Sequence, residues 1–259
     1  MRSPEPVLDI RQLRKSFGGL RAVDGCTFTV QAGRITALIG PNGAGKTTVF
    51  HLISGLLHPD DGEIWFRGHR IDGLPPHAIA RLGLTRTFQI PRELQRLTVL
   101  ENLLLYAKNH PGERLTGALF GRRRFRAVEE ALVRRAEEIL DLVDLRHLAD
   151  EYAGHLSGGQ KKLLELARAL MAHPELVLLD EPGAGVNPTL MKRLVEVIQQ
   201  ANRRGQTFLV IEHDMDLVMT LSHHVIVMSQ GRRLTEGPFE EIRRNEEVLE
   251  HYFGQVHAK

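Results

Sequence analysis

The chain has 259 residues, 42% of them hydrophobic and 25% charged, and 34 lysines and arginines against 32 aspartates and glutamates give a net charge of +2. This composition excludes intrinsic disorder and fibrous classes, and the charge gives no general reason to expect nucleic-acid binding. No apolar run approaches the roughly 20 residues that span a bilayer. The first residues lack the layout of a secretory signal, and the single cysteine, Cys26, excludes a disulfide framework. We therefore expect a cytoplasmic globular protein.

The first part of the chain alternates between two kinds of strand. Cys26–Val30 and Glu63–Arg67 each have one apolar face, which is typical of antiparallel strands. Ile35–Ile39 is almost continuously apolar, as expected for a parallel strand covered by helices on both faces. A helix-length segment, Thr47–Leu57, follows that strand.

A glycine-rich loop joins this strand to this helix and matches the phosphate-loop pattern G-x-x-x-x-G-K-[ST]. Glycines let backbone N–H groups turn toward phosphate oxygens, and the helix N-terminus adds partial positive charge. Lys46 would reach the β- and γ-phosphates, and the Thr47 hydroxyl would bind Mg²⁺. A plain glycine-rich turn is the alternative, which the strand–loop–helix context disfavours. The candidate nucleotide-binding residues are Gly40, Pro41, Asn42, Gly43, Ala44, Gly45, Lys46, Thr47 and Thr48.

After Gln89 the pattern becomes helical. Glu130 and Arg134 are spaced to pair outside an apolar helical stripe of Val128, Ala131, Leu132, Ile139, Leu140 and Val143. We expect a single α/β domain with a phosphate-loop nucleotide-binding core, a mixed sheet and a small antiparallel β part. In this interpretation the core takes residues 1–87 and 159–240, a helical insertion takes 88–158, and a short C-terminal helical segment takes 241–259.

The string Leu156–Gln160, LSGGQ, precedes an amphipathic helix at Lys161–Met171. Ser157 has the side chain of a helix N-cap, and two glycines follow at the open helix end. The pattern therefore predicts a second anion site, with an ordinary capped helix as the alternative.

Acidic residues follow the next buried strand, Leu176–Leu179. Ligands of open α/β sheets bind beyond the carboxyl ends of the strands, where Asp180 and Glu181 emerge. Asp180 could hold Mg²⁺ through water, and Glu181 could take a proton from the attacking water as a general base. Together with the phosphate loop they predict a nucleoside-triphosphatase. Two further apolar runs, Thr207–Ile211 and Val225–Met228, supply more buried strands.

LSGGQ, placed between the phosphate loop and the LVLLDE strand, resembles the signature of ATP-binding cassette (ABC) proteins, and the resemblance covers essentially the whole chain. It implies that Phe17 stacks on adenine, where the family more often has Tyr. Gln89 would touch Mg²⁺ or the attacking water, and His213 would contact the γ-phosphate. Asn187 departs from the family's usual Asp, which puts the cross-subunit hydrogen bonding of its loop in doubt. The signature residues of the nucleotide site would be Ser157, Gly158, Gly159 and Gln160.

The resemblance also implies an assembly and a branch of the family. Two cassettes would pack head to tail, so that ATP lies between one phosphate loop and the partner's signature. Several local strings look like those of branched-chain amino-acid importer ATPases: SFGGLRAVDG, GLTRTFQ, LTVLENL, TGALFGRRRFR, IEHDMDLVM and HYFG. We therefore expect an ATP-hydrolysing importer subunit that uses ATP and Mg²⁺ and sits peripherally on the cytoplasmic face of the cell (inner) membrane. Its partners would be a second ABC ATPase subunit in a homo- or heterodimer, permease subunits and, indirectly, a substrate-binding protein, but no nucleic acid.

Several alternatives stay open at this point. The insertion at Tyr106–Arg126 carries a net charge of +5, and it could be a solvated loop or a contact with anionic lipid or the permease. Lipopolysaccharide export and urea import use similarly short cassettes. DNA-repair or ribosome-acting members would need coiled-coil insertions or a second cassette, which this sequence lacks. A pure nucleotide-binding regulator would lack the general base, whereas Glu181 is present.

Overall fold

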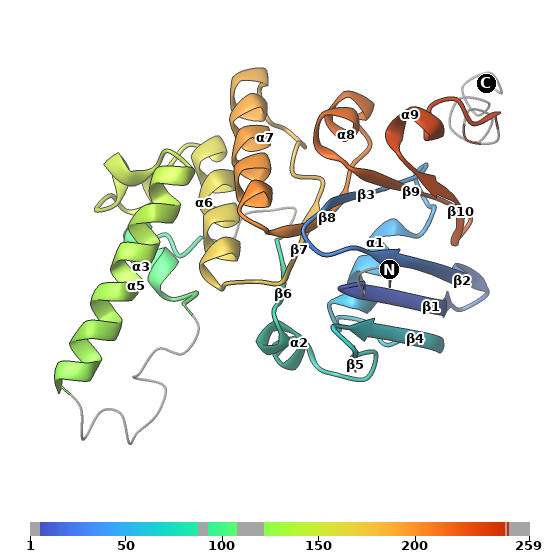
Figure 1. Ribbon diagram of the computed structural model, residues 1–259, viewed down its shortest axis with the longest axis horizontal. Helices are drawn as coiled ribbons and strands as arrows, with labels where there is room; N and C mark the ends of the chain where they lie inside the picture. The colour runs from blue at the N-terminus through green and yellow to red at the C-terminus, as the bar shows by residue number, and fades with distance from the viewer. Residues whose placement is uncertain (1–5, 88–92, 108–121, 247, 249–259) are drawn as a thin grey trace, which may run out of the picture. The chain divides into compact units, whose positions relative to one another are not determined.

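The structure is a computed structural model that describes residues 6–87, 93–107, 122–246 and 248. Its contacts divide the chain into two compact units (Figure 1). The first comprises Met1–Arg86, Glu175–Gly185 and Ile198–Lys259, and the second comprises Thr87–Pro174 and Val186–Val197. No helix among the described residues is long and apolar enough to cross a membrane.

A six-stranded mixed sheet forms the centre of the first unit, in the order β10-β9-β3-β8-β7-β6. The neighbours from β9 to β6 are parallel, and β10 pairs antiparallel with β9 at one edge. Every residue of β3, β7 and β8 is buried, which confirms the prediction of strands covered on both faces. The strand bounds are β3 (Ile35–Ile39), β6 (Leu84–Arg86), β7 (Leu176–Asp180), β8 (Thr207–Ile211), β9 (His224–Ser229) and β10 (Arg232–Gly237).

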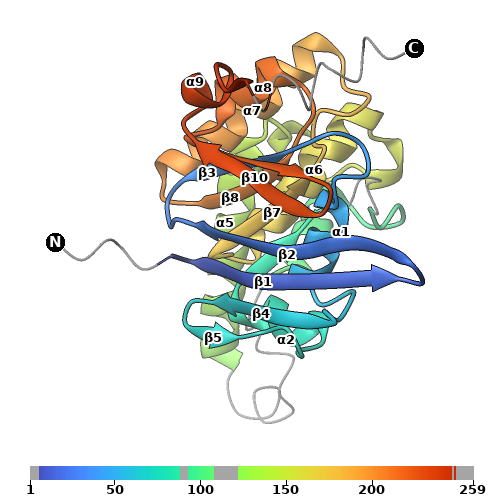
Figure 2. The same cartoon turned by 90° about the vertical axis from the view of Figure 1, so that its right-hand side faces the viewer.

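The second sheet of this unit is antiparallel and has the order β2-β1-β4-β5 (Figure 2). It contains the two predicted one-faced segments, within β2 (Leu20–Val30) and β4 (Asp61–Phe66), beside β1 (Leu8–Phe17) and β5 (His69–Arg70). Apolar side chains from both sheets and from helix α1 (Lys46–Ile53) form one buried cluster. Because α1 packs in this cluster, the loop that precedes it is anchored to the core.

Further helices complete the first unit: α2 (Pro76–Leu82), α8 (Met215–Leu221) and α9 (Phe239–Ile242). Val218 of α8 and Ile242 of α9 join a second buried cluster with residues of β3 and β9. The sheet is therefore covered by apolar side chains on two sides. Helix α7 (Pro188–Arg203) contributes residues to both units.

The second unit is helical and contains α3 (Val99–Leu104), α5 (Arg122–Leu142), α6 (Gly158–Met171) and two short 3₁₀ turns at Arg146–Leu148 and Ala153–His155. The three α-helices contact one another in pairs. Ala136, Ile139 and Leu140 of α5 are buried, whereas Ala131, which the helical pattern placed on the apolar stripe, is exposed. Glu130 pairs at 3.1 Å with Arg126, one turn before it, and not with the expected partner Arg134, one turn after it.

Candidate functional site

The predicted phosphate loop lies between β3 and α1, and two glycines make its course possible. Gly45, the residue before α1, has φ +96°, and a Cβ there would lie 2.4 Å from the carbonyl oxygen of Ala22. A Cβ on Gly40 would lie 2.3 Å from the carbonyl oxygen of Met228. Both approaches exclude any larger residue, so the loop can run against β2 and β9 only with glycine at these positions.

Lys46 folds back over this loop. Its buried Nζ donates to the carbonyl oxygens of Gly40 at 2.7 Å and of Pro41 at 3.0 Å. Burial lowers the pKa of Lys46, and the nearby carboxylates of Glu181 and Asp180 oppose that shift. The ammonium is therefore held where the loop, the first turn of α1 and two acidic residues meet.

Those two acidic residues stand at the carboxyl end of β7, as the sequence predicts. Asp180 is the last residue of the strand, and Glu181 continues the ladder by donating its N–H to the carbonyl of Ile211 at 3.0 Å. Glu181 then takes a left-handed conformation with φ +47°, unusual for a residue other than glycine. Its Oε1 lies 3.8 Å from Nδ1 of His213, which follows β8 and is 63% exposed. Four of the predicted site residues, Lys46, Asp180, Glu181 and His213, thus gather at one edge of the parallel sheet.

Sequence reasoning missed two residues at this edge. Glu212 is only 2% exposed, and its carboxylate accepts hydrogen bonds from the N–H groups of Gly183 at 2.9 Å and His213 at 3.2 Å. Burial raises the pKa of Glu212 above its ordinary value. Arg86 donates from Nη2 to Oδ2 of Asp180 at 2.8 Å. The available signal was a charged residue directly at the end of a strand in each case.

Phe17 ends β1, and 47% of its surface is exposed. Nζ of Lys15 lies 5.9 Å from the centre of its ring, and that ammonium also pairs with Asp60 at 2.7 Å. An exposed aromatic ring with solvent on its surface is available to stack on a planar base.

The signature segment belongs to the second unit. The Ser157 hydroxyl accepts from the N–H of Gln160 at 3.3 Å, and the Gln160 side chain accepts from the N–H of Ser157 at 2.9 Å. This capping box confirms the expected N-cap at the start of α6. A Cβ on Gly159 would fall 2.2 Å from Cδ2 of Leu190, whereas a Cβ on Gly158 would meet no atom within 4 Å. Asn187 accepts from the N–H of Leu190 at 2.9 Å, so its side chain starts α7. Gln89 lies outside the described residues, as does most of the basic insertion.

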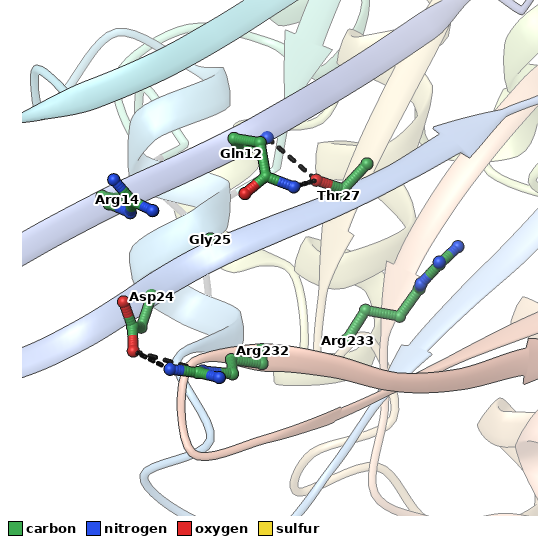
Figure 3. Close-up of a pocket in the computed structure, with 7 residues that line it drawn as sticks. All are labelled: Gln12, Arg14, Asp24, Gly25, Thr27, Arg232 and Arg233. Carbon is green, nitrogen blue, oxygen red and sulfur yellow. Dashed lines mark hydrogen bonds and ion pairs between the residues drawn. The ribbon is translucent and has the colours of Figure 1, made fainter.

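A separate pocket of about 300 Å³ lies on β1, β2 and β10 (Figure 3). It is lined by Gln12, Arg14, Asp24, Gly25, Thr27, Arg232 and Arg233. Each arginine has an acidic partner: Arg232 pairs with Asp24, Arg14 with Asp61 and Arg233 with Glu236. None of the predicted site residues lines it, and its positive charge is already compensated.

The donor set at the sheet edge fits Mg²⁺. This ion prefers hard oxygen ligands, and it is usually held by one or two protein groups together with substrate phosphates and water. The Asp180 carboxylate and the hydroxyl of Thr47, an exposed residue at the start of α1, are such donors. Among the described residues no cluster of three or more His, Cys, Asp or Glu could hold a metal by itself.

Comparison with known proteins shows the family to which the chain belongs. Residues 23–184 match the family model described as ABC transporter. A probable branched-chain amino acid transport ATP-binding protein, LivG, of Archaeoglobus fulgidus is 44% identical over 96% of this chain and 95% of its own length. The high-affinity branched-chain amino acid transport ATP-binding protein BraF of Pseudomonas aeruginosa is 41% identical over 97% of this chain and 99% of its own length.

Solved structures give the same assignment. The ADP conformation of an ATP-binding cassette from an ABC transporter superposes with a TM-score of 0.82 at 38% identity, covering 96% of this chain and 99% of that one. The expected α/β class is thereby confirmed. With a phosphate loop, a strand-end Asp-Glu pair and a capped LSGGQ helix in the chain, it belongs to the ABC transporter family and is one of its ATP-hydrolysing cassettes.

Proposed function

We propose that this chain powers an ABC importer for branched-chain amino acids. The observation that carries the ATPase part is the meeting of Lys46, Asp180, Glu181 and His213 at one edge of the parallel sheet. The substrate class is supported by the names of relatives that are 40–44% identical over nearly the whole chain.

We assign the nucleotide contacts as follows. The backbone of residues 40–48 and Lys46 would hold the phosphates of ATP, and Phe17 would stack on its adenine. Thr47, Asp180 and Gln89 would hold Mg²⁺, which, when bound, neutralises negative charge on the phosphates.

Glu181 would act as general base toward the attacking water. Its carboxylate is half-buried and lies 3.8 Å from His213, which would contact the γ-phosphate. The left-handed conformation directs the chain away from the ladder at this residue, and two backbone hydrogen bonds, to Ile211 and from Ala184, hold it there. Because the backbone is fixed in this way, the side chain starts from a set position, so the carboxylate would need less rearrangement to take a proton.

The nucleotide site would be completed by a second cassette. Each chain carries one phosphate loop and one signature helix, and the signature residues Ser157–Gln160 would contact ATP on the opposing subunit. The Ser157 hydroxyl and the N–H groups at the start of α6 offer donors and a positive helix end to that phosphate. Closure of the dimer on ATP and its release after hydrolysis would move the helical insertion, residues 88–158.

The helical insertion would transmit this movement to the membrane permease subunits, which in turn receive the amino acid from a substrate-binding protein. In this proposal the chain would lie peripherally at the cytoplasmic face of the cell membrane.

Substitution of Glu181 by Gln tests the hydrolytic mechanism. The amide keeps the shape of the side chain but cannot accept the proton, so ATP should still bind while turnover falls by orders of magnitude. Near-normal turnover in this variant would refute the assignment of the general base.

Uptake of labelled leucine, isoleucine and valine by cells with and without this chain tests the transported substrate. Loss of uptake of all three, restored by the wild-type chain but not by Glu181→Gln, is the expected result. Unchanged amino-acid uptake, with a defect in urea uptake or lipopolysaccharide export instead, would assign the chain to one of those systems.

A further inference from the structure

Behind the predicted metal ligand lies a buried arginine that belongs to none of the nucleotide-binding motifs. Arg86 is the last residue of β6, and Asp180 is the last residue of the neighbouring parallel strand β7. Nη2 of Arg86 lies 2.8 Å from Oδ2 of Asp180, with the two side chains 9% and 8% exposed. A charge-assisted hydrogen bond at this depth is shielded from solvent and is stronger than a surface ion pair.

The guanidinium is also held by the helix that follows the phosphate loop. Its Nη1 lies 3.4 Å from Oγ of Ser54, the C-cap residue that directly follows α1. Its Cζ lies 5.8 Å from the centre of the Phe50 ring on the same helix. Arg86 therefore touches β7 and α1, which supply Asp180 and Thr47, two of the three expected metal ligands.

The contact leaves one oxygen of the carboxylate for a second cation. Arg86 takes Oδ2 of Asp180, and among the described residues no other ion pair to this carboxylate is formed. With Oδ2 fixed, the carboxylate cannot rotate freely, so Oδ1 has a defined direction before any ligand arrives. A ligand group that is already oriented loses less conformational entropy on binding.

We propose that Arg86 is a positioning residue that orients Asp180 for the binding of Mg²⁺ with nucleotide. This rests on the proposed role of Asp180 as a metal ligand. Residues that orient a metal ligand through a hydrogen bond typically change metal affinity by 10- to 100-fold when they are replaced. Arg86 would act through Asp180 and is not itself a proposed contact of the nucleotide or of the metal.

The test is the Mg²⁺ dependence of ADP binding, measured by isothermal titration calorimetry on the full chain. ADP is titrated with Mg²⁺ present and again with EDTA, and the ratio of the two affinities isolates the contribution of the metal. In Arg86→Met this ratio should fall about tenfold. The affinity in EDTA should change by less than about threefold, because Lys46 and the backbone of the phosphate loop remain.

Two variants serve as controls. Arg67→Met removes another arginine of the same unit, whose Nη1 pairs with Glu175 at 2.5 Å with both side chains about half exposed; its ratio should equal that of the wild type. Arg86→Lys keeps a positive charge but loses the planar guanidinium, so it should lose less of the ratio than Arg86→Met. If circular dichroism shows that Arg86→Met does not fold, Arg86→Lys supplies the ratio of affinities instead.

Asp180→Asn separates failure of this inference from failure of the metal assignment. If Asp180→Asn lowers the ratio and Arg86→Met leaves it unchanged, Asp180 binds the metal without help from Arg86 and the inference is wrong. A higher ratio in Arg86→Met would also overturn it, because Arg86 would then compete with Mg²⁺. If Asp180→Asn has no effect, the metal assignment and the inference both fall. The double variant should lose no more of the ratio than Asp180→Asn alone.

Discussion

Replacement of Glu212 by alanine should destabilise the protein and slow hydrolysis together. The Glu212 carboxylate is buried and accepts hydrogen bonds from the N–H groups of Gly183 and His213. Alanine leaves both donors without this acceptor, and each buried donor that loses its partner costs roughly 1–3 kcal/mol. The carboxylate no longer has to be desolvated, which offsets part of that loss. We therefore expect the free energy of unfolding to fall by about 2–4 kcal/mol.

The effect on turnover follows from the position of these donors. Gly183 lies two residues after Glu181, and His213 directly follows Glu212, so the carboxylate ties together the two loops that carry the proposed base and the proposed γ-phosphate contact. A displacement of about 1 Å in such groups can reduce the rate by up to 100-fold. ATP hydrolysis at saturating ATP should therefore slow about 10- to 100-fold. Glu212→Gln retains one acceptor oxygen, so its loss of stability and its loss of turnover should both be smaller than those of Glu212→Ala.

Urea denaturation and steady-state ATPase assays measure the two effects. Glu175→Ala is the matched control, because it removes a carboxylate of the same unit that pairs with Arg67 at the surface, where such pairs contribute about 0–1 kcal/mol. If Glu212→Ala unfolds at the same urea concentration as Glu175→Ala, the two backbone donors do not depend on this carboxylate. A stability loss with unchanged turnover would show that the loops keep their positions without it.

Three other outcomes follow from the described contacts. Glu181→Gly should abolish turnover. Its free energy of unfolding, measured by urea denaturation, should be about 1 kcal/mol higher than that of Glu181→Ala, because only glycine adopts φ +47° without strain. Equal stability of the two variants would contradict a strained Glu181. The raised pKa of Glu212 means that its contribution to stability is full below its unfolded pKa of about 4.5 and is lost as the pH rises through the folded pKa. The stability of Glu212→Gln relative to wild type should therefore increase between pH 5 and pH 8, and a pH-independent difference would argue against a raised pKa. Ser157→Ala should lower the unfolding temperature by about 2–4 °C, equivalent to roughly 1 kcal/mol of stability. Ser157→Asn should keep the wild-type unfolding temperature, since both serine and asparagine cap helices. If the asparagine variant unfolds at as low a temperature as the alanine variant, capping is not the cause.

The strands and the phosphate loop could be predicted because their signals are local. A run such as Ile35–Ile39 is apolar on both faces only if both faces are covered, and the glycines at 40 and 45 mark a loop where no Cβ fits. The N-cap at Ser157 is equally local, since its bonding partner Gln160 lies three residues away. Such features require no knowledge of distant parts of the chain.

The contacts that sequence reasoning missed join residues far apart in the chain. Arg86 and Asp180 are separated by 94 positions, and Gly183 and Glu212 by 29. Their meeting depends on which strands are neighbours, and the apolar pattern shows that a strand is buried without showing its place in the sheet. The ion pair of Glu130 failed for a different reason: two arginines lie one turn away, and the spacing rule does not choose between Arg126 and Arg134.

The strand order itself explains why the missed residues lie at the proposed site. In the sequence β6-β7-β8 of the sheet, Arg86, Asp180 and Glu212 stand at or just beyond three adjacent carboxyl ends. The end of the central strand, β7, supplies Asp180 and Glu181. Both must be held in position, because Asp180 carries a buried charge and Glu181 has a strained backbone. On one side, Arg86 neutralises the charge of Asp180. On the other side, Glu212 binds the loop that follows the strained residue Glu181. The neighbouring strands thus support the reactive pair from both sides, which is the arrangement that a preorganised site requires.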